Sequence, residues 1–283
     1  RPHGDPHAVA CDVGALVNGL RIADEKGVFQ DIEVPEGSTY TRVGHMLVDN
    51  LKGYLVSHAH LDHIAGLIAA SPDDGKKPIY ALPSVNADIE QTYFNWEAWP
   101  NFGDRGKEPQ LKKYEYRDLA AGAKAELTGT AMHVTPYPLS HGGVEATAFL
   151  IESGDDALLC FGDTGPDAVE KSTRMAEVWA AVADRLQQKR LKAIIIETSY
   201  TNAQPDDLLF GHLTPAWLLK SLKELEAKAG AGSLKDLPVV VSHIKWPAKT
   251  LVTPQEEILA QLQAGNDLGV NFIIPEQGMA WRF

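Results

Sequence analysis

The chain has little cysteine, fewer basic than acidic residues and no long hydrophobic run. Each shortage argues against one class of protein. Only Cys11 and Cys160 occur among 283 residues, which excludes a disulfide scaffold and predicts two buried thiols. No apolar run reaches the ~18 residues of a membrane helix. With 26 basic and 38 acidic residues, the net charge is −12, which is poorly suited to following a long polyphosphate backbone.

The remaining composition predicts a globular α/β protein. Hydrophobic residues make up 44% of the chain, enough for a sizeable core. No change in composition marks a linker, so we predict a single domain over residues 1–283. The chain begins at Arg1 rather than Met, so we expect a cleaved or truncated segment before it. We expect no membrane partner, and the residues do not distinguish a periplasmic from a cytoplasmic location.

Apolar runs of strand length alternate with helical patterns along the chain. The runs predict β-strands at residues 9–12, 53–57, 79–82, 132–136, 146–151, 157–161, 193–197, 238–242 and 271–274. Helical spacing predicts helices at residues 64–70, 174–189, 215–228 and 254–264. Thr214 and Thr253 each precede a proline, so we expect both to act as N-caps.

A cluster of metal-binding side chains directly follows the second predicted strand. It comprises His58, His60, Asp62 and His63. His58 and His60 are two positions apart, so they point to one side of an extended strand end. Histidine is the commonest protein ligand of transition metals, and chance rarely groups four such side chains so tightly. The cluster therefore predicts a site that holds two metal ions a few ångströms apart.

The pattern His-x-His-x-Asp-His resembles the signature of the metallo-β-lactamase superfamily. Its extension through Ile64, Gly66, Ser71 and Pro72 resembles the class II cyclic-nucleotide phosphodiesterases. Similar segments occur at residues 93–101 and 211–215, and the resemblance spans residues 12–243. It implies an αββα sandwich of two βα halves. Ser57-His58 and Ser242-His243 both end an apolar strand, which agrees with such halves.

The resemblance also implies a complete set of metal ligands. Carried over by position, the first ion takes His58, His60 and His141, the second takes Asp62, His63 and His243, and Asp163 bridges both. Asp12 is expected to orient a histidine rather than to bind metal. Zinc is the expected ion because imidazoles with a shared carboxylate suit a borderline cation. Manganese or iron at the oxygen-richer second position stays open.

Two further residues resemble the part of the superfamily's site that protonates the leaving oxygen. His212 is expected to donate this proton and Glu197 to orient it, while Asp62 is counted with them as catalytic. A histidine that only caps the following helix is the alternative role for His212. The aromatic segment 93–99 either stacks on a nucleobase or packs in the core, and Trp246 is expected in the pocket wall.

The implied enzyme is a 3′,5′-cyclic-nucleotide phosphodiesterase that uses water activated by two divalent ions. It would cut the 3′ bond of cAMP or cGMP and release the 5′-monophosphate. The alternative is a nuclease of the tRNA 3′-processing type, which shares the ligands and the Glu–His pair. The net charge of −12 and the lack of a basic arm argue against a nucleic-acid polymer as partner. A homodimer is compatible with these predictions.

Overall fold

The computed structural model describes residues 1–248 and 253–283, which form two compact units. The first comprises residues 1–136 and 276–282, and the second comprises residues 137–275 with Phe283. The boundary falls within strand β6 (Met132–His141). That the two units form one domain of two βα halves stays a prediction.

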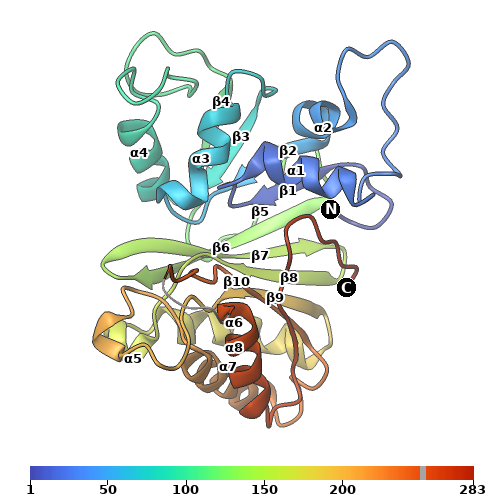
Figure 1. Ribbon diagram of the computed structural model, residues 1–283. Coiled ribbons are helices and arrows are strands. Elements are labelled where there is room, and N and C mark those ends of the chain that lie inside the picture. Colours follow the sequence, from blue (N-terminus) through green and yellow to red (C-terminus); the bar gives the residue numbers. More distant parts are fainter. Residues whose placement is uncertain (249–252) are drawn as a thin grey trace. The chain divides into compact units, whose positions relative to one another are not determined.

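The first unit contains a parallel sheet with strand order β1-β2-β3-β4 (Figure 1). Its strands are β1 (Ala8–Cys11), β2 (Leu51–Leu55), β3 (Lys77–Ala81) and β4 (Tyr114–Asp118). The helical segments are α1 (Leu16–Glu25), α2 (Arg42–His45), the π-helical η1 (Met46–Asn50), α3 (Leu61–Ala70) and α4 (Pro83–Thr92). The short strand β5 (Ala125–Glu126) pairs antiparallel with the beginning of β6. The helical segments connect the parallel strands, because the end of one parallel strand and the start of the next lie at opposite edges of the sheet.

Two features fix the interior of this unit. A Cβ atom at Gly66 in α3 would lie 2.3 Å from the Val13 carbonyl oxygen, so only glycine permits this approach of the α1 region. The buried Asp74 carboxylate, between α3 and β3, accepts from the hydroxyls of Tyr54 and Tyr114 at 2.6 and 2.9 Å. It also pairs with the Lys77 ammonium at 2.7 Å. This buried charge is thus surrounded by donors, as a stable core requires.

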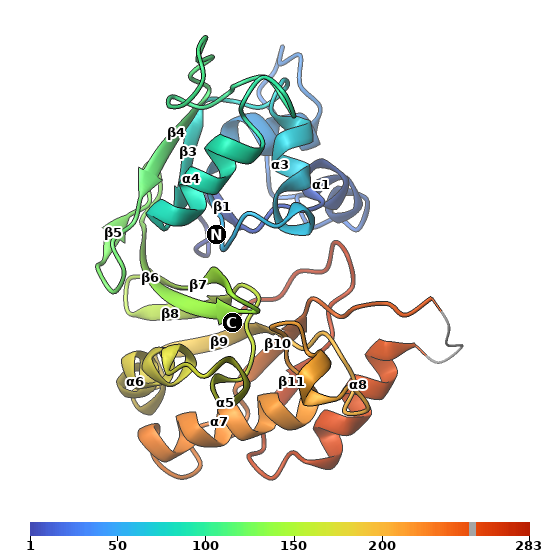
Figure 2. The same cartoon turned by 90° about the vertical axis from the view of Figure 1, so that its left-hand side faces the viewer.

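The second unit contains most of a seven-stranded mixed sheet, whose strand order is β11-β10-β9-β8-β7-β6-β5. Its further strands are β7 (Val144–Ser153), β8 (Asp156–Phe161), β9 (Leu191–Glu197), β10 (Pro238–Ser242) and β11 (Asn271–Ile273). β8 to β11 pair in parallel, whereas β7 and β8 are antiparallel. The helices are α5 (Asp167–Glu170), α6 (Arg174–Gln187), the 3₁₀ turn η2 (Asp206–Leu208), α7 (Pro215–Ala229) and α8 (Pro254–Ala264). Figure 2 shows α6, α7 and α8 along one face of this sheet.

The predicted strands and helices are all present, with ends shifted by a few residues. Two local expectations need correction. α3 begins at Leu61 rather than near Ile64, so Asp62 and His63 lie in its first turn. Thr253 caps α8 by accepting from Glu256 N, but the Thr214 side chain forms no capping bond with α7. Across residues 1–248 and 253–283, no helix is both long and apolar enough to span a bilayer.

Candidate active site

In the first unit, the loop between β2 and the first turn of α3 brings three histidines together. The His58 ring lies 4.5 Å from the His60 ring and 4.2 Å from the His63 ring, centroid to centroid. His58 and His63 are buried, whereas His60 and Asp62 are exposed. Asp62 Oδ2 lies 3.9 Å from His63 Nε2. The predicted local cluster is therefore present in space as well as in sequence.

Asp12 orients this cluster from the end of β1. It adopts a left-handed φ of 48°, and its Oδ2 lies 2.7 Å from His63 Nδ1. The same carboxylate accepts from the Ser57 backbone N–H and hydroxyl at 2.8 and 2.7 Å. Because the Ser57 proton is used on Asp12, the 3.0 Å contact with His58 Nδ1 is a bond that the imidazole donates. One carboxylate thus holds His63 directly and His58 through Ser57.

The aromatic segment after α4 supports the same loop. Phe94 is fully buried in the core, in agreement with the packing interpretation. Tyr93 donates from its hydroxyl to the carbonyl of Ala59, the residue between His58 and His60, at 2.8 Å. Burial raises the pKa of Tyr93, which keeps this donor protonated. Tyr93 therefore fixes the backbone that carries both histidines.

In the second unit, His141 ends β6 and lies against the backbone of Gly211. Its Nδ1 donates to the Gly211 carbonyl oxygen at 2.8 Å, and burial lowers the pKa of its ring. Gly211 has a φ of 81°, and a Cβ there would lie 2.3 Å from Gly142 N. The close approach therefore requires glycine, and it holds the ring in one orientation.

Asp163 follows β8 and is the point on which the histidines of this unit converge. Its Oδ2 lies 3.3 Å from His243 Nε2 and 3.8 Å from His141 Nε2. His212 Nδ1 is also 3.8 Å away. Asp163, Glu197, His212 and His243 offer ligand atoms within 4.8 Å of one another. A carboxylate with three imidazoles around it is a donor set that suits a cation.

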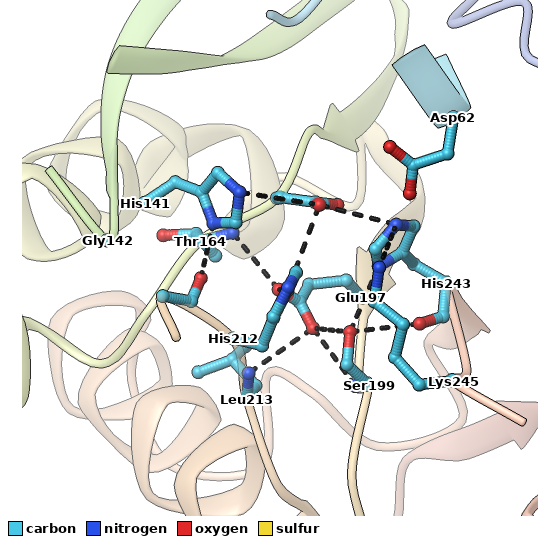
Figure 3. Close-up of polar contacts among 12 residues, drawn as sticks. Asp62, His141, Gly142, Thr164, Glu197, Ser199, His212, Leu213, His243 and Lys245 are labelled. Atoms are coloured by element: carbon cyan, nitrogen blue, oxygen red, sulfur yellow. Dashed lines mark hydrogen bonds and ion pairs between the residues drawn. The ribbon is translucent and has the colours of Figure 1, made fainter. Parts of the chain in front are cut away.

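Glu197, at the end of β9, is a buried carboxylate surrounded by donors (Figure 3). Its Oε1 accepts from His212 Nδ1 at 2.7 Å and from Thr164 N at 3.2 Å. Its Oε2 accepts from the Ser199 amide and hydroxyl and from Leu213 N, at 3.0, 2.8 and 3.3 Å. The predicted Glu197–His212 pair is therefore in contact, through Nδ1 of the imidazole.

The donor chemistry fits divalent ions. In His58, His63, His141 and His243, Nδ1 faces Ser57, Asp12, Gly211 and Ser199 respectively. A neutral imidazole protonated at Nδ1 presents its Nε2 lone pair as the ligand atom, and such partners are typical of metal-binding histidines. In each unit the histidine nitrogens are thus prepared for coordination.

The sequence did not predict the hydrogen-bonding roles of Ser57, Tyr93, Thr164 and Ser199 in the site. Ser57 and Ser199 could have been noticed by their position alone, because each lies two residues after the end of a strand, β2 or β9. Trp246 is 62% exposed, so its expected place in a pocket wall stays a prediction. Lys245, beside it, has its Nζ 3.5 Å from His243 Nε2.

Comparisons with known proteins agree on one family. The model of the family described as cAMP phosphodiesterases class-II matches residues 28–278. A 3′,5′-cyclic-nucleotide phosphodiesterase of Aliivibrio fischeri is 51% identical, covering 100% of this chain and 86% of that protein. A probable 3′,5′-cyclic-nucleotide phosphodiesterase of Yersinia pestis is 42% identical, covering 100% and 83%.

Solved structures agree on the fold. Unliganded yeast PDE1 superposes with a TM-score of 0.80 at 23% identity, covering 97% of this chain and 90% of that one. The metallo-β-lactamase fold protein YhfI of Bacillus subtilis gives 0.60 at 15% identity, covering 99% and 88%. The predicted α/β fold of the metallo-β-lactamase type is thereby confirmed.

Proposed function

Because this chain belongs to the class II cAMP phosphodiesterases, we propose that it hydrolyses the 3′ phosphodiester bond of cAMP or cGMP to the 5′-monophosphate. Two curated relatives that match the whole chain are named as a 3′,5′-cyclic-nucleotide phosphodiesterase and a probable one, which supports this proposal. The observation that carries the chemistry is the buried Glu197–His212 pair at 2.7 Å. An alkoxide leaving group needs a proton, and this pair supplies one.

We propose that the two histidine groups serve a common pair of divalent ions. One ion would be held by His58, His60 and His141, the other by Asp62, His63 and His243, with Asp163 shared. When bound, two such ions neutralise the phosphodiester and lower the pKa of a water. Zinc suits these imidazole-rich sets. The acceptors at four Nδ1 atoms support this assignment, because they leave each Nε2 for coordination.

His212 acts as the general acid in this proposal. Protonated on both nitrogens, it donates from Nε2 to the departing 3′ oxygen as the phosphorus–oxygen bond breaks. The Glu197 carboxylate stabilises the imidazolium through Nδ1 and fixes the direction of the ring. Glu197 itself is held by backbone amides of Thr164 and Leu213. The acid is thus preorganised by groups that do not react.

A nuclease of the tRNA 3′-processing type is the second candidate because it would use a similar pair of metal ions and a similar general acid. The net charge of −12 opposes binding of a long polyanion. The discriminating experiment incubates the zinc-loaded protein with cAMP, with cGMP and with a precursor tRNA. We expect 5′-AMP or 5′-GMP and an uncut precursor. Cleavage of the precursor without turnover of either cyclic nucleotide would overturn the proposal.

A further inference from the structure

Ser199 occupies a buried position between the acid pair and a metal-binding histidine. It is 1% exposed and follows β9 by two residues. Its hydroxyl lies 2.8 Å from Glu197 Oε2, 3.0 Å from His243 Nδ1 and 2.9 Å from the His243 carbonyl oxygen. Its amide also donates to Glu197 Oε2 at 3.0 Å. A single small side chain therefore contacts two functional residues that are 46 positions apart in sequence.

The single proton of the hydroxyl decides the directions of these bonds. A carboxylate is a stronger acceptor than a carbonyl, so the proton is directed to Glu197. The Ser199 oxygen can then only accept in its contact with His243, and Nδ1 must carry the hydrogen. This fixes the tautomer of His243 and leaves the Nε2 lone pair for a metal ion, with Nε2 3.3 Å from Asp163 Oδ2.

We propose that Ser199 is a positioning residue that fixes the tautomer of His243 for metal binding. It is held in place by the same carboxylate that orients His212. The inference rests on the proposed function only in taking His243 to bind a divalent ion. Ser199 also links ion binding to proton donation, because Glu197 contacts both Ser199 and His212.

The first unit offers an independent parallel. There Ser57 donates to Asp12 and accepts from His58 Nδ1, while Asp12 also holds His63. Each unit thus uses one carboxylate and one serine to hold two histidines. The serine that precedes each histidine in sequence suggests Ser242 as the counterpart of Ser57. In the described part of the chain, however, no hydrogen bond joins the Ser242 side chain to His243.

Ser199→Ala tests the proposal, with Ser242→Ala as a matched control on the other side of His243. In the variant, His243 Nδ1 loses its acceptor and the ring can place its hydrogen on Nε2, the ligand atom. Loss of such a partner weakens metal affinity by about 10–100-fold. Zn²⁺ affinity is measured by competition with a chromogenic chelator, without substrate. We expect this loss for one of the two bound ions in Ser199→Ala, wild-type affinity in Ser242→Ala, and recovery in Ser199→Thr.

A second measurement needs no variant. The ¹⁵N shifts of the imidazole nitrogens in metal-free wild-type protein should show His243 protonated at Nδ1 and bare at Nε2. Unchanged Zn²⁺ affinity in folded Ser199→Ala, an equal loss in Ser242→Ala, or an Nε2–H tautomer in the wild type would each overturn the proposal. Because these readouts do not involve cAMP, a wild-type protein that fails to hydrolyse cAMP would refute the proposed activity and leave this inference standing.

Discussion

Replacing Glu197 by glutamine perturbs the acid with little change in volume. The carboxylate accepts five hydrogen bonds, among them the 2.7 Å bond from His212. A glutamine amide lacks the charge that stabilises the imidazolium. Its NH₂ group would also face N–H and O–H groups that now donate to the carboxylate. A hydrogen bond to a charged group contributes about 1.5–3 kcal/mol. At 1.36 kcal/mol per tenfold, Glu197→Gln should lower kcat for cAMP by about 10–150-fold, and His212→Ala should lower it at least as much.

The comparison between leaving groups isolates the role of the acid. With saturating Zn²⁺, kcat is measured for cAMP and for bis(p-nitrophenyl) phosphate, whose phenolate leaves without protonation. Glu197→Gln should slow the second substrate far less than the first. Glu152→Gln is the matched control, because Glu152 is a buried glutamate of the same unit that pairs with Arg185. It should affect both substrates equally or not at all. Equal losses on both substrates in Glu197→Gln would refute the proton-donor reasoning.

Three further outcomes follow from the described contacts. Asp12→Asn removes the carboxylate at His63 Nδ1, so Zn²⁺ affinity in chelator competition should fall about 10–100-fold; unchanged affinity would exclude the orienting role. Asp74→Ala leaves the buried Lys77 ammonium without its carboxylate, which should cost about 3–5 kcal/mol of unfolding free energy in urea, and a loss under half of this would contradict the burial argument. The Arg105 guanidinium holds the pKa of Asp118 below its usual value of 3.8. The resulting stability is present above that pKa and is lost as the pH falls through the folded-state value. Asp118→Asn should therefore destabilise by less than about 1 kcal/mol at pH 7, with the difference vanishing at acid pH, where a persisting difference would refute the linkage.

Features that depend on residues close together along the chain could be predicted from the sequence. The spacing of His58, His60 and His63 predicted a cluster that the structure places in the loop after β2 and the first turn of α3. The Thr-Pro pair at Thr253 predicted the start of α8 correctly. Strands were found because most are buried apolar runs. These signals are local, and local periodicity survives in any fold that buries the same residues.

Partners supplied by tertiary contacts could not be predicted in this way. The echo between Ser57-His58 and Ser242-His243 agreed with two βα halves, but it did not reveal that Ser199, after another strand, contacts His243 Nδ1 as Ser57 contacts His58 Nδ1. The carbonyl of Gly211 reaches His141 from 70 residues away. Strand β4 was not among the predicted strands, although the first residues of the strand alternate between buried and exposed, a pattern typical of a strand. Helices α1 and α4 were not predicted either, although α1 carries a clear amphipathic pattern.

Metal dependence and cleavage at the 3′ bond are tested together by one titration. Metal-free protein receives increasing Zn²⁺ at saturating cAMP, and the nucleotide products are separated and quantified. We predict no turnover without metal, and a rate of 5′-AMP formation that rises until two equivalents are bound. Full turnover in excess chelator, or 3′-AMP as the product, would contradict a metal-dependent phosphodiesterase that protonates the 3′ oxygen.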